Sequence, residues 1–118
     1  MFRTLSVGVM LVAILAPLSA FQEPYKVGGD VTSPTVSTKV DPKYTQEAKA
    51  AKVEGAVTLK LVVDRNGVPR DIEVVKPLGS GLDESAITAV SQWRFEPGTK
   101  DGQAVDVIAN IEVNFRLL

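Results

Sequence analysis

Two carboxylates, Asp71 and Glu73, lie two residues apart in a stretch of strand-like composition, so both side chains would point to the same face of a strand. Such a pair supports acid–base chemistry only where burial separates the two pKa values. Three further acids, Asp64, Asp106 and Glu112, fall in the same kind of position, on polar faces of predicted strands or in turns. We therefore interpret all five carboxylates as solvated surface groups, not as catalytic acids.

The chain of 118 residues contains no histidine and no cysteine. This excludes histidine bases, thiol nucleophiles, disulfides and the usual zinc ligands, and it leaves Ser80, Ser85 and Ser91 without the histidine that a catalytic triad needs. The net charge is −1 and there is no basic block, so the electrostatic pattern of a nucleic-acid-binding protein is missing. We expect no enzyme, no metal site, no cofactor and no nucleic-acid partner.

The first 20 residues have the pattern of an export signal, with a positive charge at Arg3, an apolar run over residues 5–18 and small residues at Ser19 and Ala20. A membrane anchor is the alternative, but the run is shorter than the ~20 residues of a spanning helix, and Pro17 interrupts it. We predict a signal peptide (or short membrane anchor) at 1–20, a linker at 21–33 and one domain at 34–118. The protein is expected in the periplasm or otherwise exported, with membrane association only if the leader stays uncleaved.

The domain is organised around a long predicted strand at residues 105–117, in which apolar and polar side chains alternate. As the final segment of the sequence, it is expected at a sheet edge, where unpaired N–H and C=O groups can accept another strand. The apolar face of this strand would pack into the core. The candidate partner-binding residues on the wet face are Asp106, Ile108 (the apolar exception), Asn110, Glu112, Asn114 and Arg116.

A helix and a hairpin are predicted before this strand. Thr45 is placed to cap a helix over residues 46–53, which Gly55 would close. Alternating residues 57–64 and 68–76 form two strands joined at Asn66-Gly67, a pair typical of a type I′ turn with positive φ at both positions. β-Branched residues at 35–40 predict a further extended segment.

A second helix is predicted after a capping box, in which Ser80 caps the helix and Asp83 reaches back to the backbone. Trp93 and Phe95 follow this helix and could form a ligand-stacking platform, but Trp93 completes an apolar stripe, which favours a place in the core. Arg94 remains open between a structural ion pair and a partner surface. The predicted core residues are Leu59, Leu61, Leu82, Ala86, Trp93, Phe95, Ile111, Val113 and Phe115.

These elements predict an α+β domain of two layers, with a three-stranded antiparallel sheet and two helices packed on one face. Several short motifs occur along it in a fixed order. They are Pro42-Lys43-Tyr44, Val53-Glu54-Gly55-Ala56-Val57, Asp64-Arg65-Asn66-Gly67-Val68, Gly81-Leu82-Asp83-Glu84-Ser85-Ala86, Trp93-Arg94-Phe95-Glu96-Pro97, Asp101-Gly102-Gln103-Ala104-Val105 and Val113-Asn114-Phe115.

In order and spacing, these motifs resemble the C-terminal domain of the TonB family of energy transducers, over residues 28–118. The resemblance implies the same two-layer fold. It also implies that strand 105–117 pairs with a short segment of an outer-membrane TonB-dependent receptor, and that Pro42, Lys43 and Tyr44 contact the receptor. Full transducers of the family carry an inner-membrane anchor and a long Pro-rich linker, whereas only residues 21–33 follow the leader here.

We therefore expect a periplasmic protein-binding module that acts in TonB-dependent transmembrane transport by β-strand addition. The alternative is a structural or scaffold domain of the periplasm with no transport role, in which the same edge pairs with a second copy to form a homodimer.

Overall fold

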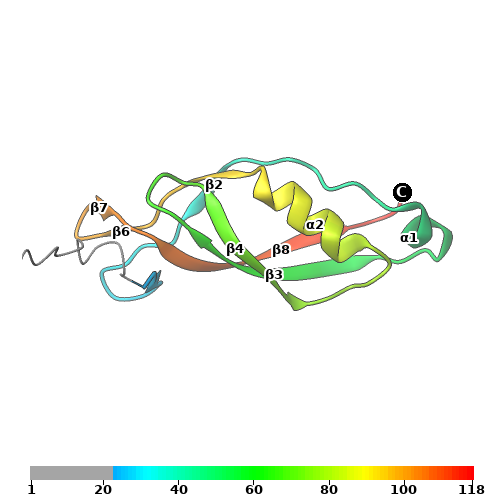
Figure 1. Cartoon of the computed structure of the whole chain (residues 1–118), viewed down its shortest axis with the longest axis horizontal. Helices are drawn as coiled ribbons and strands as arrows, with labels where there is room; N and C mark the ends of the chain where they lie inside the picture. Colours follow the sequence, from blue (N-terminus) through cyan, green and yellow to red (C-terminus); the bar gives the residue numbers. More distant parts are fainter. Residues whose placement is uncertain (1–22) are drawn as a thin grey trace, which may run out of the picture.

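The computed structural model describes residues 23–118. The predicted leader at 1–20 lies outside the described residues and remains a prediction. The α+β class is confirmed, with two helices set against antiparallel strands (Figure 1). The elements in chain order are β1 (Tyr25–Lys26), β2 (Thr35–Thr38), α1 (Gln46–Ala50), β3 (Gly55–Val63), β4 (Pro69–Lys76), α2 (Leu82–Ser91), β5 (Arg94–Glu96), β6 (Thr99–Lys100), β7 (Gln103–Ala104) and β8 (Val107–Phe115).

The main sheet has the strand order β1-β8-β3-β4. β3 and β8 pair antiparallel over their full lengths, from Gly55 opposite Phe115 to Val63 opposite Val107. β4 returns antiparallel on the other side of β3, with two register irregularities. α2 crosses one face of this sheet, while α1 lies beside the last residues of β8 (Figure 1). The three predicted antiparallel strands, β8, β3 and β4, are therefore neighbours in the sheet, and β1 adds a fourth strand beside β8.

A fourth strand, β1, extends the predicted three-stranded sheet. Tyr25 and Lys26 pair in parallel with Val107 and Ile108 at the start of β8. Residues 23–33, the described part of the region expected as a linker at 21–33, therefore pack on the domain, and Val31 is buried there. A strand of two residues is too short to show an alternating pattern, which is why the sequence did not reveal it.

The turn between β3 and β4 lies where it was predicted, but the predicted type I′ geometry is wrong. Gly67 adopts a φ of 80°, whereas Asn66 is not among the residues with positive φ. The Asp64 carboxylate instead accepts hydrogen bonds from the backbone N–H groups of Asn66 and Val68, at 2.8 and 2.9 Å. Because the Asp64 carboxylate accepts hydrogen bonds from two amides of the turn, it stabilises the turn from one side. Of Asn66 and Gly67, only Gly67 then adopts a left-handed backbone conformation.

The predicted capping box at α2 is also wrong. The N-cap is Gly81, which has no side-chain cap, and Ser80 adopts a φ of 56° in the preceding turn. Asp83 does reach back, but to the N–H groups of Leu78 and Gly79, at 2.7 and 3.1 Å. The carboxylate therefore orders the loop before the helix, and it lies in the first turn, where the helix dipole favours negative charge.

The cap predicted for α1 is confirmed, since Thr45 Oγ1 accepts from the N–H of Ala48 at 3.1 Å. The helix ends earlier than expected, at Ala50 with Ala51 as its C-cap, so Gly55 does not close it. The extended segment expected at 35–40 contains β2, which pairs antiparallel with β5. No helix within residues 23–118 has the length and apolar composition to cross a membrane.

The core lies between the sheet and the layer formed by α2 and the segment before α1. Trp93 is 6% exposed, and its indole N–H donates to the Val40 carbonyl at 2.8 Å, which ties this segment to the end of α2. Of the residues predicted for the core, Ile111 is half-buried against it. The others lie in the buried cluster, namely Leu59, Leu61, Leu82, Ala86, Trp93, Phe95, Val113 and Phe115.

Candidate functional site: the free edge of β8

The edge of β8 that faces away from β3 is paired only at its beginning. β1 covers it at Val107 and Ile108. From Ala109 to Phe115, no strand of the described chain pairs with this edge. About seven residues of main chain are therefore available for an incoming strand, a length typical of strands in globular proteins.

The contact with β1 shows which amide groups point outward. The N–H of Tyr25 donates to the carbonyl of Asp106 at 2.9 Å, so Asp106 directs its backbone toward the β1 edge. Backbone groups of successive strand residues point to opposite edges. Asn110, Glu112 and Asn114 therefore direct their N–H and C=O groups to the free edge, while the residues between them bond to β3.

The six residues predicted for partner binding differ in their positions. Asn110, Glu112 and Asn114 are exposed members of β8. Ile108 is half-buried, and its edge is covered by Lys26 of β1. Arg116 is exposed and lies one residue beyond the strand. The accessible part of the edge is thus shorter than the predicted strand 105–117.

The sixth residue, Asp106, precedes β8 and is engaged within the chain. Its carboxylate accepts from the backbone N–H of Arg65 and from the Arg70 guanidinium, both at 2.9 Å. Partial burial opposes ionisation of Asp106, but these two hydrogen bonds and the two positive charges outweigh it, so the pKa of Asp106 is lowered. Asp106 therefore makes a structural contact, which joins the β3–β4 hairpin to the start of β8.

A groove of about 580 Å³ lies beside the beginning of the free edge. Ala109, Asn110 and Ile111 form one side, and Pro34 and Val36, before and within β2, form the other. Every residue of β2 is exposed. The sequence did not predict this groove, because its walls come from segments that are far apart in the chain and meet only through tertiary packing.

The predicted contact segment before α1 lies at the other end of the same edge. The Tyr44 ring packs edge-to-face on Phe115, the last residue of β8, with ring centroids 5.6 Å apart. Its hydroxyl donates to the Val53 carbonyl, and its pKa is raised by desolvation and then by the negative charge of Glu54. Tyr44 therefore lies next to the end of the free edge of β8.

The neighbouring residues of this segment face α2. The carbonyl of Lys43 accepts from the Ser85 hydroxyl. Pro42 and Lys43 line a second groove of about 460 Å³ with α2. The segment between β2 and α1 therefore runs alongside α2, as Figure 1 shows.

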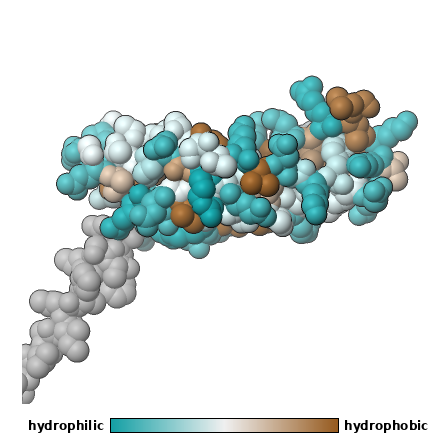
Figure 2. All heavy atoms as spheres, turned by 90° about the horizontal axis from the view of Figure 1, so that it is seen from above, coloured by the Kyte–Doolittle hydropathy of each residue, from teal (hydrophilic) through white to brown (hydrophobic). Residues whose placement is uncertain are grey.

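Figure 2 shows a largely hydrophilic face, on which hydrophobic residues form small separate groups. No cluster of three or more potential metal ligands occurs within residues 23–118. Arg94, which the sequence left open, donates to the Trp93 carbonyl at 2.7 Å and forms no ion pair with any described residue.

Comparison with known proteins assigns the domain. The profile of the family described as Gram-negative bacterial TonB protein C-terminal matches residues 40–117. The chain belongs to the TonB C-terminal family. The matched region contains both β8 and the segment before α1, whereas β1 and β2 precede it.

Two relatives and one solved structure illustrate the similarity to TonB proteins. Protein TonB of Vibrio cholerae is 32% identical over 83 residues, which cover 70% of this chain and 34% of that protein. Protein tonB2 of Pseudomonas aeruginosa is 34% identical over 77 residues, which cover 64% of this chain and 28% of that protein. The solution NMR structure of the Pseudomonas aeruginosa TonB CTD has a TM-score of 0.54 at 22% identity, and the match covers 82% of this chain and 99% of that one.

The chain thus matches about a third of the length of these curated TonB relatives. The NMR structure supports the TonB C-terminal fold. Since the TonB family is a non-enzymatic family of energy transducers that act through protein interactions, the chain is not an enzyme.

Proposed function

We propose that this domain binds an extended segment of an outer-membrane receptor, which adds to the sheet as a strand along the free edge of β8. The domain would act in this way in TonB-dependent transport, in the periplasm. The observation that carries the proposal is the unpaired edge from Ala109 to Phe115, in a chain that belongs to the TonB C-terminal family.

Affinity would come mainly from the backbone. Asn110, Glu112 and Asn114 each present one N–H and one C=O group to the incoming strand. A hydrogen bond of this kind contributes a net ~1 kcal/mol, so several together with apolar burial support moderate affinity. Side chains beside the edge would then select among receptor segments.

The segment at Pro42, Lys43 and Tyr44 is proposed as a second contact. Tyr44 packs on Phe115, so a strand that extends to the end of β8 would arrive beside this ring. Residues 1–20 are proposed to direct export, as a cleaved signal or as a membrane anchor, before the domain at 34–118.

The direct test removes one outward amide without removing the strand. Proline at position 110 or 112 eliminates an N–H that faces the free edge, and proline is tolerated on an edge strand. The matched controls, Asn110→Ala and Glu112→Ala, change the same side chains but keep the amide. All four variants should keep the far-ultraviolet circular dichroism spectrum of the parent.

The probe is an array of peptides from the N-terminal periplasmic segments of the outer-membrane receptors encoded in the same genome. Peptides that bind the parent should lose about tenfold or more in affinity with Asn110→Pro and Glu112→Pro, and much less with the alanine controls. Unchanged affinity in both proline variants would reject strand addition at β8.

Sedimentation of the domain over a range of concentrations tests the alternative of a homodimer. A stable dimer that binds no receptor peptide, and that Asn110→Pro converts to monomer, would assign the edge to self-association instead.

A further inference from the structure

The groove beside β8 is lined by two basic side chains, Lys26 and Lys60, and by no acidic side chain. This contrasts with the chain as a whole, which carries 13 basic and 14 acidic residues. The local excess of positive charge lies where a strand added to the edge would begin to pair.

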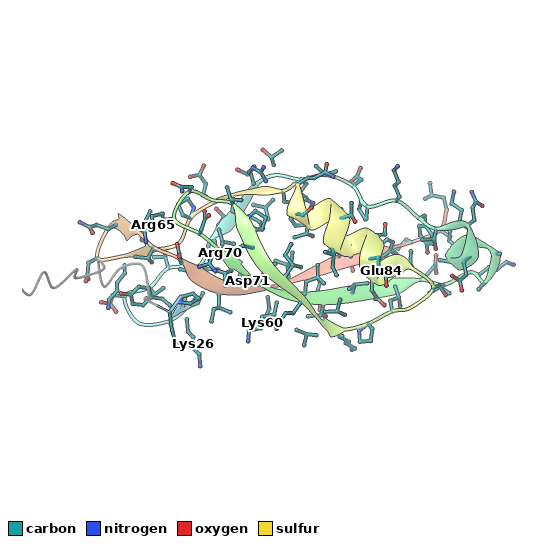
Figure 3. All side chains as sticks on the ribbon, viewed as in Figure 1. Lys26, Lys60, Arg65, Arg70, Asp71 and Glu84 are labelled. Atoms are coloured by element: carbon teal, nitrogen blue, oxygen red, sulfur yellow. The ribbon has the colours of Figure 1, made fainter. Side chains whose placement is uncertain are left out.

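The two lysines reach this place from opposite sides of β8. Lys26 lies on β1 and is paired with Ile108. Lys60 lies on β3 and is paired with Asn110, so its side chain must extend across β8 to line the groove. Cross-strand partners share a face of the sheet. Lys26, Lys60 and Asn110 therefore belong to the face that α2 does not cover, as Figure 3 shows for the two lysines.

Neither lysine has a carboxylate partner among residues 23–118. The ion pairs of this region are formed by Arg65 and Arg70. On the side of β3 away from the groove, Lys60 shares a smaller pocket with Asp71 and Glu73 of β4, but it forms no ion pair with either. Both lysines are exposed, so their side chains are available to a ligand.

The wall on the other side of the groove is apolar. Pro34 and Val36 line it, and Val36 is 38% exposed. Successive side chains of a bound strand would point alternately to opposite faces of the sheet. One set would meet the apolar wall and the other set would meet the lysines, so the groove selects for alternation of apolar and acidic residues.

We propose that the segment bound along β8 carries a carboxylate that lies between Lys26 and Lys60, with apolar side chains at the alternate positions facing Pro34 and Val36. This inference rests on the proposed strand addition and specifies the chemistry of the partner. Lys26 precedes the residues that the family profile matches, so this part of the selectivity comes from the chain's own N-terminal segment.

The test uses end-blocked synthetic peptides of seven residues that alternate valine and threonine. In one series a single glutamate replaces each threonine in turn, and in the twin series glutamine stands in the same place. Binding is located by the amide NMR signals of Asn110, Glu112 and Asn114 and measured by titration. One glutamate position should bind about three- to tenfold more tightly than its glutamine twin, as expected for partly exposed ion pairs.

Charge variants identify the lysines responsible. Lys26→Gln and Lys60→Gln should each reduce the preference for glutamate over glutamine, and the double variant should abolish it. Lys76→Gln is the matched control, because Lys76 is an exposed lysine at the end of β4 that does not line the groove. The preference should also weaken at 0.5 M salt, where exposed charges are screened.

The outcomes separate the two proposals. Equal binding of the glutamate and glutamine series at β8 would reject the carboxylate site while leaving strand addition intact. A preference that Lys76→Gln removes as effectively as the groove variants would also reject it, as a general charge effect. If no peptide shifts the β8 amides, strand addition itself fails and the carboxylate site fails with it.

Discussion

Replacement of Gly67 by alanine should destabilise the domain more than its place in a surface turn suggests. A Cβ at Gly67 would lie 2.0 Å from the carbonyl oxygen of Phe95 and 3.1 Å from its carbon. The two backbones approach closely because the N–H of Phe95 donates to the Gly67 carbonyl at 2.9 Å. The β3–β4 turn is therefore packed directly on β5.

Gly102 provides a matched control for the size of the effect. Its φ is 81°, against 80° for Gly67, but a Cβ there would meet nothing within 4 Å. At both positions a left-handed alanine costs about 1–2 kcal/mol, partly offset by about 0.4–1 kcal/mol of lost entropy in the unfolded chain. Only at Gly67 must the backbone also separate, which breaks a hydrogen bond worth about 1 kcal/mol and strains local packing by about 1–3 kcal/mol.

Gly67→Ala should therefore be about 2–4 kcal/mol less stable than Gly102→Ala, which corresponds to a Tm difference of roughly 10 °C or more. Urea denaturation followed by the fluorescence of the single tryptophan measures both variants. Trp93 is a suitable reporter because its ring centroid lies 6.2 Å from that of Phe95. Equal losses in the two variants would refute the close-contact argument and leave only the cost of positive φ.

Two further predictions concern buried or paired polar groups. Because the pKa of Asp106 is lowered from 3.8, its charged form stabilises the fold above that value, and this stability is lost as the pH falls through the lowered pKa. The Asp106→Asn variant should thus be less stable than the parent at pH 7, and its stability should change less with pH below pH 4. Urea denaturation at several pH values measures this. Curves of stability against pH that run parallel for variant and parent would contradict the prediction. Trp93→Phe, which removes the hydrogen bond to Val40, should cost about 1–3 kcal/mol by chemical denaturation followed by circular dichroism, and a loss near zero would mean that this bond contributes nothing.

Local patterns in the sequence predicted the central architecture well. In β3, β8 and α2, one face is buried in the core and the other is not. The pattern of apolar and polar residues therefore predicts each element directly. Turn chemistry was less predictable, because short polar side chains have several backbone partners within reach. Asp64 and Asp83 both bind loop amides, and these contacts displaced the predicted turn type and the predicted cap at Ser80.

The candidate site was predictable only as a strand. The exposed positions Asn110, Glu112 and Asn114 follow from alternation, but the limits of the free edge do not. Those limits depend on β1, whose two residues are held by tertiary contact with β8 and have no signal of their own. The engagement of Asp106 likewise depends on Arg65 and Arg70, which are distant in sequence.

The position of β1 makes the two ends of the edge unequal. A ligand strand that moves toward the start of β8 meets Lys26 and can go no further, because the main-chain groups there are already bonded. At the other end, past Phe115, no β-strand of the described chain stands in the way. Length tolerance should therefore be one-sided: additions to one terminus of a ligand would be accommodated, and additions to the other terminus would force it out of alignment.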